Sequence, residues 1–474
     1  MNREPAKPTQ LGERSARGAI DLSSPLHLHV VGVGGAGMSA IALVAAGMGH
    51  TVSGSDLKES RVMHLLRAAG VHVSVGHAAG NVLGADAVTI SSAIRQENPE
   101  VVEANRLGIP VYSRADVLSA IARTRLAIAV AGTHGKTTTS SMLALMLVEA
   151  GLQPSFMIGG ELNEVGTGAV WDAGAWLVLE ADESDGTFLR LDHEIAIVTS
   201  VEPDHIAHYG SFASLRAAFA EFLRAAERFK VVCVDDPVAC ELAAGSDALT
   251  YGTDRSAEYV LDALQLKKSS TTFDLVHDSA VVAEVSLPVP GLHNARNAAG
   301  ALVTCLEMGV DPEPACRALS RFAGVARRFE FRGGARGVSF VDDYAHLPSE
   351  VRAALATARL AEPERVICVF QPHRYSRTAD LWRELGDAVA GADVVVITDV
   401  HPAGEMPVPG ISGKLVADAA AFAEPAKQVI YAPTREELAP LVSTLLLPGD
   451  LCLTLGAGDL TYLPDELIAV LEAK

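Results

Sequence analysis

The segment Gly132-Thr133-His134-Gly135-Lys136-Thr137-Thr138 constrains the fold of this chain more than any other feature. It follows an apolar run, residues 126–131, that predicts a buried strand, and it leads into residues 141–150, which predict a helix. A turn between a strand and a helix directs backbone N–H groups at one point beside the positive end of the helix dipole. Such a point favours a phosphate chain, so the segment predicts a nucleotide site in a parallel α/β domain.

The side chains of this phosphate loop agree with ATP as the ligand. Lys136 would place a positive charge on the β- and γ-phosphates, and the Thr137 hydroxyl would bind Mg²⁺. The usual longer pattern has a glycine where this chain has Val130, so the loop is a compact variant. The alternative is a turn that only caps a helix, but the order of strand, Gly-Lys-Thr and helix favours ATP.

Composition excludes several classes of protein. The net charge is −20 and no basic block stands out, which argues against nonspecific nucleic-acid binding. No apolar run approaches the ~20 residues of a membrane helix, and no apolar leader is present, so we expect no membrane insertion. The six cysteines are scattered without a C-x-x-C pair, which predicts reduced thiols in a cytoplasmic protein and no structural zinc.

The length and the alternation of strand-like and helix-like segments predict an α/β protein of about three domains. Residues 1–24 are polar and predict a disordered tail. We expect an N-terminal Rossmann-like domain at 25–123, a central P-loop mononucleotide-binding α/β domain at 124–328, and a C-terminal Rossmann-like α/β domain at 329–474. Residues 259–287 predict antiparallel structure added to the central domain.

A second glycine-rich loop, Gly32-Val33-Gly34-Gly35-Ala36-Gly37, follows the first predicted strand and fits G-x-G-x-x-G. Asp56 closes the next strand, where an acid can bind a ribose hydroxyl, and Ser91-Ser92 follow a later strand that could border the same pocket. Alone, this pattern suggests an NAD-dependent dehydrogenase. Any diphosphate suits the same geometry, and a tight strand–helix turn without a ligand stays a third possibility.

Acidic residues end two further strands of the central domain. Glu180 stands at the end of a buried run, and His205 follows in the segment Glu202-Pro203-Asp204-His205. Both are candidates to bind a metal beside Thr137, although Mg²⁺ prefers oxygen and a histidine suits a second metal better. The alternative is a solvated acidic loop with a surface histidine.

Two asparagines and an arginine point to nucleotide contacts. Asn294 and Asn297 are three residues apart at the start of a predicted helix, so both could reach an adenine edge. Otherwise, Asn294 is a helix N-cap. Arg328 lies between the central and C-terminal domains, where a guanidinium can bind phosphate bidentately, or it is a linker charge.

Polar residues follow two strands of the C-terminal domain. Asp343-Tyr344-Ala345-His346 comes after the first, and the segment from Gln371 to Thr378, with Arg374 and Arg377, comes after the second. An acid and a histidine beside two arginines suit a zwitterionic amino acid, since the acid can bind ammonium and arginine can bind carboxylate. Scattered surface polar groups are the alternative.

Together these segments resemble the Mur ligase family, the ATP-dependent amide-forming enzymes of peptidoglycan synthesis. The resemblance covers nearly the whole chain after about Pro25. It implies three domains that bind, in chain order, a UDP-sugar, ATP and the incoming amino acid. The N-terminal glycine loop would then hold a UDP diphosphate instead of NAD.

The resemblance also implies roles for individual residues. UDP-N-acetylmuramate would be bound by Gly32, Gly34, Gly35, Ala36, Gly37, Asp56, Ser91 and Ser92. ATP would be bound by Gly132, Thr133, His134, Gly135, Lys136, Thr137, Thr138, His293, Asn294 and Asn297. Metal would be held by Thr137, Glu180 and His205, and L-alanine would be framed by Tyr344, His346, Arg374 and Arg377. The catalytic set would be Lys136, Arg328, Asp343 and His346.

Some positions depart from the family pattern. Position 347 is Leu where a second histidine is frequent, and Ser200-Val201 stand where Asn-Ile is usual. The chain has no lysine between residues 137 and 229, whereas sister ligases that add later residues use a carbamylated lysine. This fits the branch that joins L-alanine to the lactyl carboxylate of UDP-N-acetylmuramate through an acyl phosphate. A ligase that recycles an intact tripeptide and a non-catalytic ATP-driven switch stay open as alternatives, as do a monomer and a homodimer.

Overall fold

The computed structural model describes residues 19–162 and 166–473, which form two compact units. The first unit comprises the described residues up to Arg125 with Ala169–Trp171, and the second comprises Leu126–Gly168 and Asp172 onward. Most of the tail predicted at 1–24 lies outside the described residues. Within its last part Ile20 and Leu22 are buried, because their apolar side chains pack instead of remaining in solvent.

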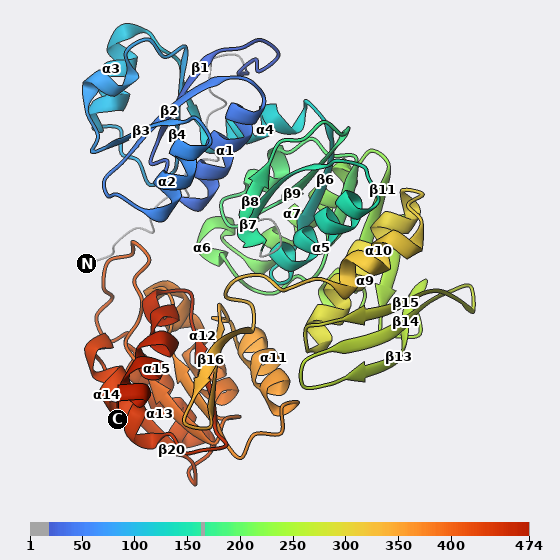
Figure 1. The fold of residues 1–474 in the computed structure, drawn as a ribbon, viewed down its shortest axis with the longest axis vertical. Coiled ribbons are helices and arrows are strands. Elements are labelled where there is room, and N and C mark those ends of the chain that lie inside the picture. Colours follow the sequence, from blue (N-terminus) through green and yellow to red (C-terminus); the bar gives the residue numbers. More distant parts are fainter. Residues whose placement is uncertain (1–18, 163–165, 474) are drawn as a thin grey trace, which may run out of the picture. The chain divides into compact units, whose positions relative to one another are not determined.

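The first unit is a parallel sheet of five strands in the order β3-β2-β1-β4-β5. Its helices flank the strands (Figure 1). The order reverses between β1 and β4, which is the switch point where such sheets bind ligands. The strands are β1 (His27–Val31), β2 (Thr51–Asp56), β3 (His72–Val75), β4 (Ala87–Ile90) and β5 (Val111–Ser113), and the helices are α1 (Ala36–Gly47), α2 (Arg61–Ala68), η1 (Ala79–Val82), α3 (Pro99–Leu107) and α4 (Arg114–Ala122).

The second unit contains a sheet of ten strands in the order β15-β14-β13-β12-β11-β10-β6-β9-β7-β8. Strand β6 pairs in parallel with both β10 and β9, so the segments after these three strands meet at one edge. The predicted antiparallel addition is confirmed in β13, β14 and β15. The strands are β6 (Leu126–Ala131), β7 (Ser155–Leu162), β8 (Thr167–Val170), β9 (Trp176–Glu180), β10 (Ile195–Val198), β11 (Phe229–Cys233), β12 (Leu249–Gly252), β13 (Tyr259–Leu266), β14 (Thr271–His277) and β15 (Ala280–Leu287).

The helices of this central part include one whose start differs from the prediction. Helix α5 begins at Lys136, not at Ser141, because the hydroxyls of its first turns find partners: Ser141 Oγ donates to the Thr137 carbonyl, and Thr139 Oγ1 donates to Asn297 Oδ1. The helices are α5 (Lys136–Glu149), η2 (Thr187–Arg190), α6 (Ile206–Tyr209), α7 (Phe212–Ala225), α8 (Pro237–Ala244), α9 (Leu292–Glu307) and α10 (Pro312–Ser320).

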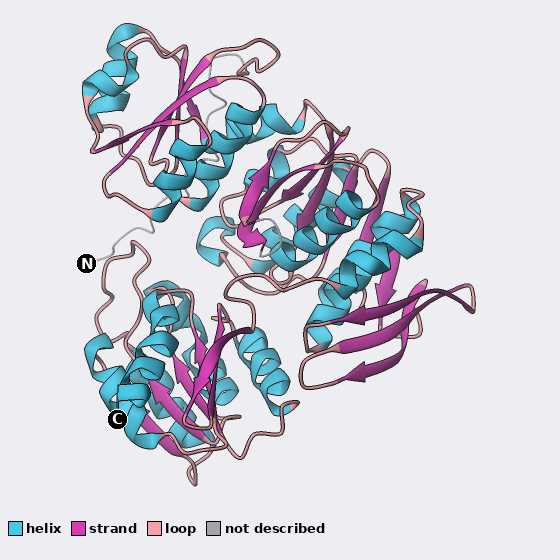
Figure 2. Cartoon of the chain, in the orientation of Figure 1, coloured by secondary structure: helices cyan, strands magenta, loops and turns pink. Residues whose placement is uncertain are grey.

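The C-terminal part of the second unit is a sheet of six strands in the order β16-β17-β21-β18-β19-β20, in which only β16 is antiparallel. Helices cover both of its faces (Figure 2). Its elements are β16 (Glu330–Ala335), β17 (Val338–Asp343), α11 (Pro348–Arg359), β18 (Val366–Phe370), α12 (Tyr375–Val389), β19 (Val394–Ile397), α13 (Gly413–Ala423), β20 (Gln428–Tyr431), α14 (Arg435–Leu445), β21 (Leu451–Leu455), η3 (Asp459–Tyr462) and α15 (Leu463–Ala473).

The strands of this sheet are apolar on both sides, as a sheet covered by two helical layers requires. Cys368 packs with α11, α12 and α13, whereas its neighbour Val369 packs with α14 and α15 on the opposite face. Because successive side chains of a strand point to opposite faces of the sheet, neighbouring residues pack into two different cores. Among the helices of the described residues, none combines the length and apolar character needed to cross a membrane.

Candidate active site

The phosphate loop depends on two glycines with left-handed backbone. Gly132 has φ 140° and Gly135, which precedes α5, has φ 82°. A Cβ atom at Gly132 would collide with Thr199 Oγ1, and one at Gly135 would collide with Asn297 Oδ1. Only glycine permits both this conformation and this close approach. The loop therefore packs against the end of β10 and against α9, which bring further polar groups to the same place.

The ammonium of Lys136 is enclosed by acceptors. Its Nζ donates to the Gly132 carbonyl at 2.6 Å and to the two carboxylate oxygens of Glu183 at 3.1 and 2.9 Å. Burial would lower the pKa of Lys136, but the charges of Glu183, Asp182 and Glu180 outweigh it and raise that pKa. Burial in turn raises the pKa of Glu183 to about 7, although Lys136 opposes the shift.

Two of the three predicted metal ligands contact each other directly. Thr137 Oγ1 donates to Glu180 Oε1 at 3.0 Å, and the Gly159 backbone N–H donates to Glu180 Oε2 at 2.7 Å. His205, the third, pairs with its neighbour Asp204, with 3.2 Å between Nε2 and Oδ2. Within the described ranges, no cluster of three or more His, Cys, Asp or Glu residues could hold a metal ion. The paired hydroxyl and carboxylate are hard oxygen donors, a set that fits Mg²⁺ completed by phosphates and water.

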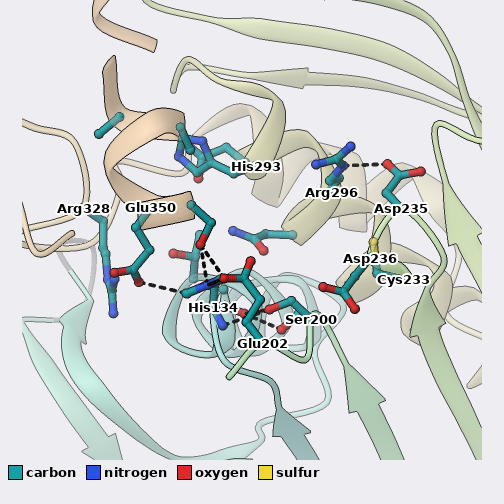
Figure 3. A pocket seen from close by; sticks show the side chains of 18 of the residues that line it. His134, Ser200, Glu202, Cys233, Asp235, Asp236, His293, Arg296, Arg328 and Glu350 are labelled. Carbon is teal, nitrogen blue, oxygen red and sulfur yellow. Dashed lines mark hydrogen bonds and ion pairs between the residues drawn. The ribbon is translucent and has the colours of Figure 1, made fainter. Parts of the chain in front are cut away.

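A cavity of about 310 Å³ opens beside the loop, within the usual size range of ligand pockets. Figure 3 shows its side chains converging from the phosphate loop, α9 and α11. Eight predicted site residues line it: His134, Gly135, Thr138, His293, Asn294, Asn297, Arg328 and Asp343. The polar residues that were not in the predicted set include Thr199, Ser200, Glu202, Asp235, Asp236, Arg296, Ser349 and Glu350.

The helix α9 presents its first turns to this cavity. Its N-cap is Gly291, with φ 106°, so the alternative role of Asn294 as N-cap is wrong. Asn294 Nδ2 donates to the Pro290 carbonyl at 2.7 Å, and the Oδ1 atom of Asn297 accepts from α5. Burial, with the charges of Arg328 and Arg296, lowers the pKa of His293 to about 4, which leaves a neutral imidazole at pH 7.

His134 lies between two carboxylates. Its Nδ1 is 3.0 Å from Glu350 Oε1, its Nε2 is 3.2 Å from Glu202 Oε2, and Ser349 Oγ lies 3.0 Å from the same Nε2 (Figure 3). Burial would lower the pKa of His134, but the charges and hydrogen bonds of Glu350 and Glu202 raise it to about 10. The ring is then an imidazolium that donates from both nitrogens at neutral pH.

The last residue of β17 and the segment after it supply a carboxylate, a phenol and an imidazole. Asp343 accepts from the backbone N–H groups of Phe329 and Ala345, each at 2.7 Å, and burial raises its pKa to about 6 against the charge of Arg328. His346 Nδ1 donates to the Tyr344 carbonyl at 2.9 Å, and burial lowers the pKa of His346 to about 4. The Arg328 guanidinium carbon lies 5.1 Å from the centre of the Tyr344 ring, a cation–π contact.

The two predicted carboxylate-binding arginines differ in their surroundings. Arg377 is buried, and its Nη2 donates to both oxygens of Asp204 at 3.0 Å, while Nε reaches Oδ1 at 3.2 Å. The buried Nε of Arg374 has no hydrogen-bond partner among the described residues. Arg374 is the residue before α12 and has φ 68°, so its side chain is held at the helix start. An unpartnered buried donor suits an anion.

In the first unit, the glycine loop lies at the switch point. Gly34 donates its N–H to Asp56 Oδ2 at 2.9 Å, so Asp56 holds the loop itself. A Cβ atom at Gly34 would come within 2.8 Å of that oxygen. Ser91 Oγ lies 3.9 Å from where a Gly32 Cβ would stand, which brings the segment after β4 beside the loop. The helix α1 begins at Ala36, directly after it.

Sequence reasoning missed some residues that matter here. Glu183 lies in the same acidic segment as Glu180, and its position three residues further along the chain could have suggested a shared site. Glu350 stands four residues after His346, and its position in the first turn of α11 matches that of a helix-capping glutamate, which the sequence could have indicated. No local signal relates Glu350 to His134, or Asp204 to Arg377, since these pairs are 216 and 173 residues apart.

Sequence models of one family match three stretches of the chain. Residues 27–126 match "Mur ligase family, catalytic domain", residues 130–305 match "Mur ligase middle domain", and residues 327–458 match "Mur ligase, glutamate ligase domain". Together these stretches cover most of the chain, in the order of the three sheets.

Individual relatives extend this similarity over nearly the full length. The chain is 44% identical to UDP-N-acetylmuramate–L-alanine ligase of Anaeromyxobacter dehalogenans, across 94% of this chain and 98% of the relative. It is 46% identical to the enzyme of the same name from Rubrobacter xylanophilus, across 94% and 100%. The crystal structure of UDP-N-acetylmuramate-alanine ligase from Thermotoga maritima superposes with a TM-score of 0.80 at 29% identity, across 94% and 99%. The resemblance and the three-domain α/β fold predicted from the sequence are thus confirmed, and the chain belongs to the Mur ligase family.

Proposed function

We propose that this chain joins L-alanine to the lactyl carboxylate of UDP-N-acetylmuramate, with ATP converted to ADP and phosphate. The observation that carries this proposal is the cavity in which the ATP loop, α9 and the Asp343 segment converge, in a chain whose relatives bear the name of this ligase over 94% of its length. The reaction supplies one step in the synthesis of a peptidoglycan precursor.

The three domains divide the substrates among them. We assign the UDP-sugar to residues 25–123, ATP to residues 124–328 and L-alanine to residues 329–474. In the first domain, the loop Gly32–Gly37 and Ser91-Ser92 stand at the switch point, where the backbone N–H groups suit a diphosphate. Asp56, which already accepts from Gly34, acts there by fixing the loop's shape.

The first chemical step activates the lactyl carboxylate. A carboxylate oxygen attacks the γ-phosphorus and ADP leaves, which gives an acyl phosphate with a competent leaving group. Lys136 and Arg328 stabilise the charge that develops on the transferred phosphoryl group. Mg²⁺, held by Thr137 and Glu180 together with phosphate oxygens, would supply further charge neutralisation.

The second step forms the amide bond. The ammonium of L-alanine loses a proton, the amine attacks the acyl carbon, and phosphate departs. Asp343, whose pKa is raised to about 6, is better matched to accept that proton near neutral pH than His346, whose pKa is lowered to about 4. We assign Arg374 to the alanine carboxylate, and Tyr344 and His346 to the walls of its site.

The test is phosphate release from ATP with UDP-N-acetylmuramate present and the amino component varied. L-Alanine should stimulate release strongly, and an intact tripeptide should not. Stimulation by the tripeptide alone would favour the recycling ligase, and no stimulation by either would overturn a ligase role. A nicotinamide absorbance assay in the same samples excludes the dehydrogenase alternative if no signal changes.

A further inference from the structure

The carboxylate of Glu350 touches two different parts of the proposed active site. Its Oε1 lies 3.0 Å from Nδ1 of His134 in the phosphate loop (Figure 3). Its Oε2 accepts from the backbone N–H groups of His346 at 2.9 Å and of Leu347 at 3.1 Å. One side chain in the first turn of α11 therefore joins the nucleotide loop to the segment that carries Tyr344 and His346.

We infer that Glu350 is a positioning residue that couples ATP binding to the amino-acid site, with His134 as its partner in the phosphate loop. The inference rests on the proposed function, since it takes residues 344–347 as a wall of the L-alanine site. It assigns Glu350 no contact with a substrate. Its effect reaches the reaction through the positions of His134 and of the Tyr344–Leu347 backbone.

Helix capping alone does not account for this residue. A capping glutamate in the first turn needs one oxygen to accept from the backbone N–H groups before the helix, and Oε2 does this. The Oε1 atom is turned instead toward a ring that is 216 residues away in the chain. The carboxylate is only 11% exposed, so its charge is opposed by fixed groups instead of by water.

The charges around Glu350 and His134 explain why the contact between them is stable. Burial would raise the pKa of Glu350, but His346 from its own segment, His134 from the phosphate loop and Arg328 from the residues just before β16 face the carboxylate and keep that pKa well below its usual range. On the other side, Glu202 in the turn after β10 faces His134, with Ser349 Oγ donating to Glu202 Oε2 at 2.7 Å. Both oxygens of Glu350 thus accept charge-assisted or backbone hydrogen bonds.

The phosphate loop transmits its own position to His134. The His134 backbone N–H donates to Ser200 Oγ at 2.9 Å, and its carbonyl accepts from the Thr199 hydroxyl. A nucleotide that changes this loop moves the ring as well, because the ring and the loop backbone belong to one residue. The Glu350 carboxylate then carries that movement to the backbone of His346 and Leu347.

The test exchanges donor and acceptor across the pair. Glu350→Gln keeps an oxygen for the backbone N–H groups but turns an N–H toward the protonated ring, so two donors meet. In His134→Asn, the Oδ1 atom of the asparagine can take the place of the histidine Nδ1. That oxygen can accept from the amide N–H that Glu350→Gln introduces. We expect each single variant to raise the KM for L-alanine about tenfold at saturating ATP. In the double variant, the increase in the KM for L-alanine should be at least about fivefold smaller than the product of the two single increases.

The control is Arg352→Ala, on the same helix, whose exposed side chain pairs with Asp387. It should leave both KM values unchanged. Tm values of all variants, measured in parallel, report whether α11 stays folded. Two results would overturn the inference. One is that His134→Asn changes the KM for ATP alone; the other is that the increase in the KM for L-alanine in the double variant equals the product of the two single increases. If the wild-type chain shows no phosphate release stimulated by L-alanine, the proposed function fails, and that result is distinct from independent losses in an active enzyme.

Discussion

At the scale of single residues, an internal ion pair holds the lysine of the proposed ATP site in place. The two Glu183 oxygens and the Gly132 carbonyl enclose the Lys136 ammonium. A nucleotide phosphate must draw the ammonium away from these acceptors, so the lysine is useful only to a strongly anionic ligand. The pair also keeps an empty loop from leaving a buried charge unpaired.

We expect Lys136→Ala to lower kcat by about 10³-fold or more, because the transferred phosphoryl group loses its fixed cation. Binding of UDP-N-acetylmuramate should be nearly unchanged, since Lys136 belongs to the second unit and the UDP-sugar is assigned to the first. Phosphate release and titration calorimetry measure the two effects. Loss of both turnover and UDP-N-acetylmuramate binding would contradict the assignment of substrates to domains.

Substitutions of the two arginines in the Gln371–Thr378 segment should have different effects. Arg377→Ala removes the guanidinium from buried Asp204 and leaves it only His205; breaking a buried ion pair typically costs about 3–5 kcal/mol of stability, so we expect a lower Tm. Arg374→Ala should instead raise the KM for L-alanine about tenfold or more with little change in Tm, because its Nε has no protein partner among the described residues. Equal effects of both variants on the KM alone would restore the sequence-based expectation that Arg377 binds the carboxylate.

At the scale of elements, one buried glutamate fastens a helix of the first unit to its sheet. Glu100 of α3 accepts from Ser55 Oγ of β2 at 2.7 Å and from Asn81 Nδ2 of η1 at 2.5 Å, and His29 of β1 lies 3.7 Å away. Burial would raise the pKa of Glu100, but these neighbours lower it to about 2. Four elements therefore meet at one carboxylate.

This lowered pKa predicts a pH-dependent contribution to stability. A carboxyl whose pKa falls on folding stabilises the folded state above its unfolded pKa, and the contribution is lost as pH falls through the folded value. We expect Glu100→Gln to lower the free energy of unfolding by about 3 kcal/mol near neutral pH. The difference from wild type should shrink between the ordinary value of 4.5 and about 2. Denaturant unfolding across that range measures it, and a difference independent of pH would contradict the assignment.

The elements also mark how far the sequence could predict the site. Glu180, Asp343 and His346 could be singled out from the sequence because each lies at or just after the end of an apolar strand, and the carboxyl ends of parallel strands are where such sheets bind ligands. The start of α5 was missed because buried hydroxyls resemble loop residues until their partners on α9 and within the helix are known. The contacts of Arg377 were missed because Asp204 stands in a different domain, and no periodicity connects the two.

At the scale of the whole molecule, the two units should respond to different ligands. UDP-N-acetylmuramate alone should slow amide hydrogen exchange in peptides covering 32–37 and 91–92. An ATP analogue with Mg²⁺ should slow exchange in 132–138 and 293–297, because ligand binding protects the backbone it orders. Exchange followed by mass spectrometry separates these peptides. Protection of both sets by either ligand alone would contradict the division of the substrates.

The turn after β10 fastens the central sheet to the C-terminal part at two points. Glu202 accepts from Ser349, and Asp204 pairs with Arg377, with Pro203 between them. A single contact would act as a pivot, about which one part could rotate. Two contacts on either side of a proline, whose ring fixes its own backbone angle, remove that rotation. Any separation of these parts must then break both contacts of this turn, and the His134–Glu350 pair with them.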